Sequence, residues 1–370
     1  MRGFRDRDFL ESNEGLIFCV IGNTHPVDRV VAYLKYVPYY SSSIRTKWGR
    51  DGVMYGRILP YYSALGVKST VDYLREHHPE YLVFDKYRSI ELIEVPKYRV
   101  KTHFKPEERL QEILTSQRDE LERLALELVE VLSDMTNVSL SNFGVTGSLL
   151  LKIHNLQYSD IDIVVYGQRN GWIVRDTLKE VLRSGRKPYF SLPKGEVLKE
   201  WCRDITSHHP LSLEEAMILY SKYKWNRAIY NGRQFSIHPV KLEDEVDERW
   251  EDKIYRPLGL VKVRARVVDS SNSIFMPAIY VVSDVKVLEG NSPPTQISRI
   301  VSYEGLYIDL AEPGDEVIAY GKLEEVEDLR RGEVYYQVTV GTFEANGKDY
   351  IKPISWAETK HINSETLTTN

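Results

Sequence analysis

The chain has 370 residues, a formal net charge of −5 and 28% charged residues. This length predicts two or three domains, and the charge excludes a surface coated with basic residues while leaving room for a local basic groove. No run of about eighteen apolar residues occurs, so we expect no transmembrane helix and no membrane partner.

The termini and cysteines bear on location. Residues 1–8 alternate charges and lack the apolar core of a signal peptide. Cys19 and Cys202 supply neither a disulfide framework nor a zinc site, and we interpret both as core thiols. We therefore expect a cytoplasmic protein. Abundant Tyr, Glu, Lys and Arg with few Cys and Met is typical of a thermophile.

Residues 1–104 predict a small N-terminal α+β module. Apolar runs at 16–21, 30–37, 53–59 and 81–85 indicate strands, and residues 71–77 indicate a helix. Between the second and third strands, Arg45, Lys47 and Arg50 surround Trp48, a mixture that suits binding of a nucleic-acid backbone. An exposed hairpin loop with incidental charge explains the same residues.

The next region, residues 105–250, begins with a helical pattern. Pro106 suits a first helical position, and leucines at three-four spacing from Leu110 to Leu132 predict one amphipathic helix that packs across a sheet. Gly147-Ser148 then predicts a turn that opens a short helix over 149–154. Glycine allows a phosphate to approach the backbone, and free N–H groups at a helix start attract anions.

Residues 159–166 predict a buried strand that carries two acids. Asp160 and Asp162 are two residues apart, so their side chains lie on one face. Two adjacent carboxylates are costly to bury unless something compensates their charge, and a divalent cation with oxygen preference is the natural candidate. A phosphate cradle beside a carboxylate pair is what metal-assisted phosphoryl or nucleotidyl transfer requires.

Gly147-Ser148 followed by Asp160 and Asp162 in an apolar strand resembles the DNA polymerase beta-like nucleotidyltransferase superfamily. The resemblance implies a mixed sheet with flanking helices, Gly147 and Ser148 holding the nucleotide's phosphates, and Asp160 and Asp162 binding Mg²⁺ or Mn²⁺. The whole chain also resembles an archaeal family of predicted nucleotidyltransferases with an N-terminal extension that carries Gly-x-x-His-Pro, here residues 22–26.

After the acid strand we expect helices over 172–182 and from the capping box at Ser212 to about Arg227. Lys222 and Lys224 alternate with aromatic residues near the end of the second helix. They are candidate nucleotide-binding residues, although cations also suit a helix C-terminus for electrostatic reasons alone.

A hairpin over 228–238, turning at Asn231-Gly232, departs from the superfamily. Complete members carry a third carboxylate on the strand beside the acid pair, whereas this strand offers Ser236 and His238. Three readings stay open. His238 acts as the base, because its ordinary pKa lies near neutrality. Alternatively, an acid reaches in from elsewhere, or the site binds nucleotides without turnover.

Residues 256–358 predict five short strands, at 261–268, 278–287, 297–303, 317–323 and 335–340. The pattern is similar to OB-fold barrels, which grip single-stranded nucleic acid through aromatic and basic residues. Lys262, Arg264 and Tyr280 are candidates for such contacts. A barrel that docks on its neighbours or mediates assembly is the alternative. Residues 359–370 predict a loose polar tail.

The sequence thus predicts an α+β chain with a polymerase-beta-type domain between a small N-terminal module and an OB-like barrel. We expect a magnesium-dependent enzyme that transfers a nucleotidyl group from a nucleoside triphosphate to an acceptor hydroxyl, most plausibly on RNA. The alternatives are a degenerate nucleotidyltransferase domain that acts as an RNA-binding or ribonucleoprotein-associated factor, and an assembly protein.

Overall fold

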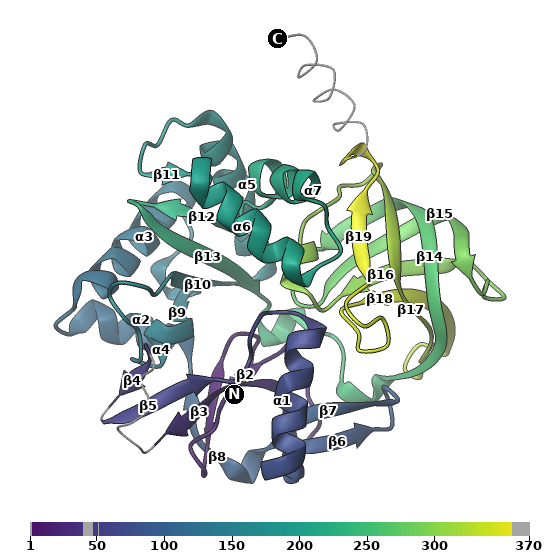
Figure 1. The fold of residues 1–370 in the computed structure, drawn as a ribbon, viewed down its shortest axis with the longest axis horizontal. Coiled ribbons are helices and arrows are strands. Elements are labelled where there is room, and N and C mark those ends of the chain that lie inside the picture. Colours follow the sequence, from purple (N-terminus) through teal and green to yellow (C-terminus); the bar gives the residue numbers. More distant parts are fainter. Residues whose placement is uncertain (1, 40–46, 51, 357–370) are drawn as a thin grey trace.

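The computed structural model describes residues 2–39, 47–50 and 52–356, which form three sheets from three successive stretches of chain (Figure 1). Helices and strands are both abundant, and each sheet holds antiparallel pairs, so the predicted α+β class is confirmed. Among these residues, no helix is long and apolar enough to cross a membrane. Cys19 and Cys202 are buried free thiols.

The N-terminal sheet has the strand order β4-β5-β3-β2-β1-β8, and β7 joins β3 to the short edge strand β6. Its strands are β1 (Phe9–Ser12), β2 (Ile17–Val20), β3 (Arg29–Tyr39), β4 (Gly49–Arg50), β5 (Val53–Arg57), β6 (Leu82–Asp85), β7 (Ile90–Pro96) and β8 (Val100–Phe104). Helix α1 (Ala64–His77) packs on β3 and buries Val71 and Leu74. Strands β1, β4, β7 and β8 lie outside the predicted runs.

The expected single helix over 106–132 is two helices, α2 (Pro106–Thr115) and α3 (Glu120–Thr136). Asp119 breaks the pattern, because its side chain accepts a hydrogen bond from the backbone N–H of Glu122 while Glu122 bonds back to the Asp119 N–H. This capping box gives hydrogen-bond acceptors to two backbone N–H groups, which in a continuous helix would bond to carbonyls of the preceding turn. The three-four spacing of leucines continues across the break, so hydrophobic periodicity alone does not show where the first helix ends.

The central sheet has the order β11-β12-β13-β10-β9. Its strands are β9 (Phe143–Thr146), β10 (Ile161–Tyr166), β11 (Phe190–Ser191), β12 (Arg227–Tyr230) and β13 (Arg233–Val240). The pair β10–β13 is parallel and the others are antiparallel. The predicted hairpin of β12 and β13 is confirmed. Helices α2 and α3 share the hydrophobic core of this sheet.

The remaining central helices are α4 (Gly147–Leu150), α5 (Gln168–Ser184), α6 (Gly195–His208) and α7 (Leu213–Ile218). The predicted capping box at Ser212 is present, with Ser212 and Glu215 as reciprocal partners. Helix α7 stops earlier than expected, because a π-helical turn, η4 (Leu219–Tyr223), follows it. Short 3-10 turns occur at Pro79–Tyr81, Lys97–Arg99, Leu140–Asn142, Glu243–Glu245, Trp250–Asp252 and Gly305–Tyr307.

The C-terminal sheet closes into a ring. It comprises β14 (Lys253–Asn272), β15 (Ala278–Gly290), β16 (Ile297–Ser302), β17 (Glu316–Asp328), β18 (Glu333–Val340) and β19 (Tyr350–Pro353). The ring runs β14-β15-β16-β18-β17 and back to β14, with β16–β18 parallel and β19 attached outside to β17. All five predicted strands are present, β14 being much longer than expected.

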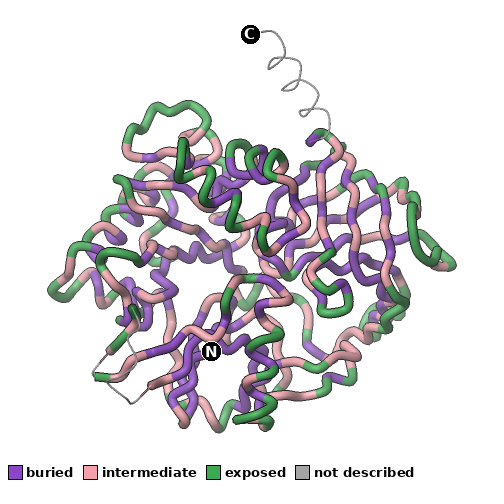
Figure 2. Tube along the Cα trace, in the orientation of Figure 1, coloured by how far each residue is buried: buried purple, intermediate pink, exposed green. Residues whose placement is uncertain are grey.

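The central sheet and the ring are held together firmly. Their apolar residues form one continuous core cluster. Arg175 of α5 binds Asp309 of the ring through two hydrogen bonds of 2.8 and 2.9 Å, and both side chains are largely buried. Figure 2 shows buried segments running through the interior of all three sheets, while exposed segments lie at the periphery. The two sheets therefore form one continuous structure.

Candidate active site

Asp162 lies on β10, in the interior of the central sheet. Its register neighbours are Thr146 on β9 and Ser236 on β13. The hydroxyl of Ser236 donates to Asp162 Oδ1 at 2.5 Å. Asp160, which directly precedes β10, accepts a hydrogen bond of 2.7 Å from Nε2 of Gln234. Because Gln234 and Ser236 are two residues apart on one strand, both acids lie on the same face of the sheet.

Gly147 lies directly beside this acid pair. Its φ is +66°, and a Cβ at this position would lie 2.2 Å from Asp162 Oδ2. Glycine is therefore required both by the backbone conformation and by the close approach of the carboxylate. The half-buried Ser148 makes no side-chain hydrogen bond within the described part of the chain. Asp162 is thus turned toward the glycine-serine bend.

Ser236 stands on the neighbouring strand where the superfamily resemblance implies a third acid. Its Oγ lies 2.8 Å from Nε2 of His238, so that Asp162, Ser236 and His238 form a chain of hydrogen bonds. Burial, followed by the nearby charges of Arg7, Lys35 and Lys224, holds the pKa of His238 well below its usual value. A neutral imidazole in cationic surroundings is a poor proton acceptor, and this argues against His238 as the base.

A replacement acid is also absent from the described residues. Among them, a single group of three potential ligands lies within 4.8 Å, namely Asp119, Glu122 and His154, and it does not include the acid pair. Its members already have partners. Asp119 and Glu122 form the α3 capping box, Glu122 pairs with Arg109, and His154 bonds to Asp119 at 2.6 Å. Helix capping explains this cluster without a metal.

The electrostatics of the acid pair fit a cation site. Burial, and then the neighbouring charge of Asp162, raise the pKa of Asp160 to about 6, while Arg227, Arg233 and Lys47 oppose the rise. The two carboxylates thus repel each other without full compensation by protein cations. Carboxylate oxygens are the donors that Mg²⁺ and Mn²⁺ prefer, and the nearby Ser236 and Thr146 hydroxyls add oxygen only. These residues fit a hard divalent cation.

The two predicted nucleotide-binding lysines differ in burial and in their partners. Lys222 is exposed in η4. Lys224 is buried, and its ammonium donates to the carbonyl oxygen of Gly305 in the C-terminal ring at 2.5 Å. Burial, and then Arg227, lower the pKa of Lys224 to about 7. Its ammonium therefore connects η4 to the C-terminal ring, and its contact with a nucleotide stays a prediction.

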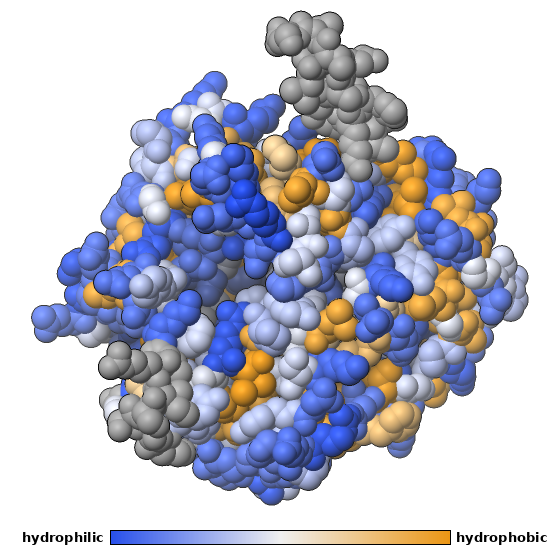
Figure 3. Space-filling view, viewed as in Figure 1, coloured by the Kyte–Doolittle hydropathy of each residue, from blue (hydrophilic) through white to orange (hydrophobic). Residues whose placement is uncertain are grey.

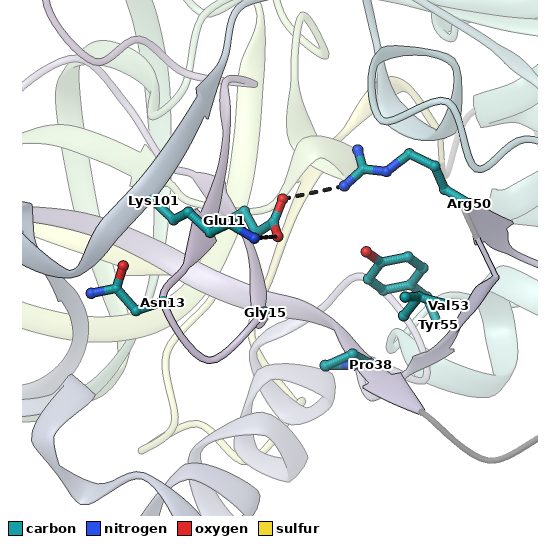
Figure 4. Close-up of a pocket in the computed structure, with 8 residues that line it drawn as sticks. All are labelled: Glu11, Asn13, Gly15, Pro38, Arg50, Val53, Tyr55 and Lys101. Atoms are coloured by element: carbon teal, nitrogen blue, oxygen red, sulfur yellow. Dashed lines mark hydrogen bonds and ion pairs between the residues drawn. The ribbon is translucent and has the colours of Figure 1, made fainter.

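The predicted nucleic-acid residues of the N-terminal loop have mixed outcomes. Arg45 lies outside the described residues. Lys47 stacks over the exposed ring of Tyr158, two residues before Asp160. Arg50 donates to Glu11 and to the carbonyl of Leu151. Glu11 also binds Lys101, and this cluster lines a cavity of about 270 Å³ (Figure 4). Arg50 is therefore held within the N-terminal sheet and against the segment after α4.

The predicted residues of the C-terminal ring are engaged in the protein itself. Lys262 pairs with Glu289 at 2.7 Å, and Arg264 pairs with Glu316 at 2.6 Å. Tyr280 is only 1% exposed, and its hydroxyl donates to the Tyr307 carbonyl. Its prediction as a base-stacking residue is wrong, because it is a core residue. The alternating pattern could not show which face of β15 is buried.

Two residues near the acid pair were missed by sequence reasoning. Arg7 and Lys35 belong to the N-terminal sheet region, and both act electrostatically on His238. The available signal was Lys35 itself, a lysine within the otherwise apolar run 30–37. Figure 3 shows a hollow lined mostly by hydrophilic residues between the central helices and the N-terminal sheet, at the level where β10 and β13 run in Figure 1.

Comparisons with known proteins give one full-length relative. The chain is 33% identical over 351 residues to the uncharacterized protein MJ1086 of Methanocaldococcus jannaschii, and the alignment covers 94% of this chain and 98% of that protein. No family model matches the chain. No solved structure is significantly similar to it.

Proposed function

We propose that this chain, which belongs to the same protein family as MJ1086 of Methanocaldococcus jannaschii, is a nucleotidyltransferase that uses a divalent cation and a nucleoside triphosphate. The observation that carries the proposal is the packing of Asp162 against Gly147. It joins the two halves of the motif, the acid pair and the glycine-serine bend, at van der Waals distance. A metal-bound triphosphate needs both halves within its own length.

Each residue has a role in this proposal. Asp160 and Asp162 hold Mg²⁺ or Mn²⁺, which supplies charge neutralisation for the triphosphate when bound. Gly147 leaves the backbone open to a phosphate oxygen, and Ser148 offers a hydroxyl. Ser236 orients the Asp162 carboxylate, and His238 orients Ser236 through the hydrogen-bond chain. Lys47 and Tyr158, at the edge of the site, are positioned for an acceptor such as RNA.

The overall architecture supports the same reading. The mixed central sheet with flanking helices is what a polymerase-beta-type domain requires. The closed ring, in which the first strand pairs with both the second and the fourth and the third runs parallel to the fifth, resembles an OB-fold barrel. We propose both assignments at the level of topology.

The experiment is incubation of purified protein with Mg²⁺ and each α-labelled nucleoside triphosphate, with RNA, DNA or no added acceptor. We expect label on one acceptor, and none when the label is on the γ-phosphate, because nucleotidyl transfer releases pyrophosphate. Asp162→Asn abolishes labelling. Asp134→Asn, a matched change at an exposed position of α3, leaves it intact. The proposal fails if every acceptor stays unlabelled while Asp160→Ala and the unmodified protein bind nucleotide equally.

The second candidate is a binding domain without turnover, and Ser236 in place of a third acid favours it. The third carboxylate normally holds a metal near the attacking hydroxyl, and no described residue replaces it. This candidate predicts RNA binding that weakens with salt and is unchanged when EDTA removes Mg²⁺. Binding that collapses in EDTA, together with transfer of α-label, would exclude it.

A further inference from the structure

The N-terminal sheet packs directly on the segment that begins with Gly147-Ser148. Leu150, Leu151 and Ile153 share a hydrophobic cluster with residues of β1, β2, β3 and the region of β5. The residues contributed by the N-terminal sheet are Phe9, Ile17, Cys19, Tyr33, Tyr36, Tyr55 and Leu59. The glycine-serine bend is therefore fixed between two sheets, with the central sheet on one side and the N-terminal sheet on the other.

A second contact joins the backbone at Arg7 to Thr146, the residue before Gly147. The hydroxyl of Thr146 donates to the carbonyl oxygen of Arg7 at 2.7 Å, and Thr146 is the register neighbour of Asp162. Arg7 has φ of 69°, which is unfavourable for a residue with a side chain. Its side chain is close to that of Asp6, with Nε 3.3 Å from Oδ2. Such backbone strain concentrates where function requires a fixed side-chain position.

Lys35 is the most unusual cation of this region. It is 6% exposed, and its ammonium lies 5.0 to 5.6 Å from the ring centres of Phe9, Tyr62 and Tyr36. No carboxylate forms an ion pair with it among the described residues. A buried ammonium without an anion is costly, and aromatic faces offset only part of that cost. The site is therefore short of an anion in this conformation.

Lys35 lies two residues after Tyr33 on β3, so it shares the face of that strand whose residues pack against Leu150 and Leu151. Burial lowers the pKa of Lys35, whereas Tyr62, Tyr36, Cys19 and Asp162 raise it, and the balance lies above the usual value. Lys35 also acts on His238, together with Arg7. Two cations of the N-terminal region thus act on the site from the side that packs against residues 146–153.

We propose that the N-terminal sheet is the anion-binding half of the active site, in which Lys35, assisted by Arg7, binds the polyphosphate of a nucleotide whose metal is held by Asp160 and Asp162. The identity of the ligand rests on the proposed function; the anion site itself rests on Lys35. A polyphosphate supplies the anion that Lys35 lacks, and its metal supplies the cation that the two acids lack. One metal-bound polyphosphate would thus compensate both the positive charge of Lys35 and the negative charge of the two acids.

The test compares Lys35→Met, Lys35→Arg and the control Lys68→Met, which removes an exposed lysine of α1. Isothermal titration with Mg·ATP, Mg·GTP and inorganic triphosphate measures binding, and thermal unfolding without ligand measures stability. We expect Lys35→Met to weaken binding of all three probes about 10- to 100-fold, as for loss of a charged hydrogen bond. We expect Lys35→Arg to retain most binding, and the unliganded Lys35→Met protein to unfold at the same or a higher temperature.

Several outcomes overturn the inference. One is equal binding by Lys35→Met and the unmodified protein. Another is binding of no probe by the unmodified protein. A third is destabilisation by Lys35→Met without weaker binding, which would mark a purely structural lysine. If Lys35→Met does not fold, Arg7→Gln must weaken triphosphate binding instead. If Lys35→Met still transfers α-label, this inference is wrong but the proposed enzyme is not. If binding depends on Lys35 but no label is transferred, the proposed enzyme is wrong but the anion site is not.

Discussion

At the scale of single residues, Gly147 carries two constraints that can be separated. Gly185 shares its left-handed backbone, with φ of 62° against 66°, but a Cβ at Gly185 would meet nothing within 4 Å. We therefore expect Gly185→Ala to cost about 1 kcal/mol of unfolding free energy, and Gly147→Ala to cost at least about 1 kcal/mol more, since Asp162 must also move. Urea unfolding of both variants measures the difference. Equal costs would mean that Asp162 does not press on the bend.

Ser236 allows a test by addition rather than removal. Its register places a new carboxylate beside Asp162, so Ser236→Asp restores the third acid that the superfamily resemblance implies. A third negative charge without a cation destabilises the protein, and a bound divalent cation reverses the effect. We expect a lower melting temperature in EDTA, recovery in millimolar Mn²⁺ or Mg²⁺, and faster nucleotidyl transfer. Ser141→Asp, an exposed change on the 3-10 turn before β9, is the control.

A melting temperature of Ser236→Asp that is the same in EDTA and in Mn²⁺ would contradict a metal site at Asp162.

The candidate site could be predicted from the sequence only in part. Asp160, Asp162, Ser236 and His238 are placed by strand alternation, which is local and was read correctly. Lys35 interacts electrostatically with Asp162 from a strand more than a hundred residues earlier in the chain. No local sequence pattern can predict an interaction over such a separation.

At the scale of elements, the break between α2 and α3 depends on Asp119. Asp119→Ala removes the acceptor for the Glu122 N–H and the partner of His154. We expect a loss of about 1–2 kcal/mol in urea unfolding, the usual cost of deleting an N-cap. Asp119→Asn keeps a capping oxygen and should lose much less. If both variants are as stable as the unmodified chain, the two helices behave as one, as the leucine spacing alone suggested.

Element prediction succeeded for the five ring strands and failed for some other elements. Three of the five predicted ring strands, β14, β15 and β17, have a buried face of period two, whereas β16 and β18 are buried in continuous runs. Helix α6 lies outside the predicted elements, and it buries only Trp201 and Cys202 along fourteen residues. Strand β1 was not predicted, because it is buried on both faces and too short to show alternation. Its existence depends on the sheet that it joins, which is a tertiary property.

At the scale of the whole molecule, one buried contact joins all three sheets. Glu304 of the ring accepts a hydrogen bond of 3.0 Å from the N–H of Ala64, at the start of α1. Its other oxygen lies 3.1 Å from Nδ1 of His209, at the end of α6. Both side chains are about 5% exposed. Burial raises the pKa of Glu304 to about 8 and lowers the pKa of His209 to about 4, so both groups are neutral between these values.

The junction therefore makes stability depend on pH with a defined sign. In the unfolded chain Glu304 loses its proton near its ordinary pKa of 4.5, whereas the folded protein keeps it to about pH 8. The folded state binds more protons in this interval, so stability falls as pH rises from about 4.5 to 8. His209 acts in the opposite direction, because only the unfolded state protonates it between pH 6.5 and 4. This pair thus favours folding most at mildly acidic pH.

Glu304→Gln isolates the carboxyl, because the amide keeps an acceptor for Ala64 and has no proton to lose. We expect the variant to melt at a higher temperature than the unmodified chain at pH 8, and the difference to shrink toward zero at pH 5. Thermal unfolding at constant ionic strength measures both profiles. A gap that does not change between pH 5 and 8 would mean that Glu304 ionises normally, and that the contact among the three sheets is open to water rather than sealed.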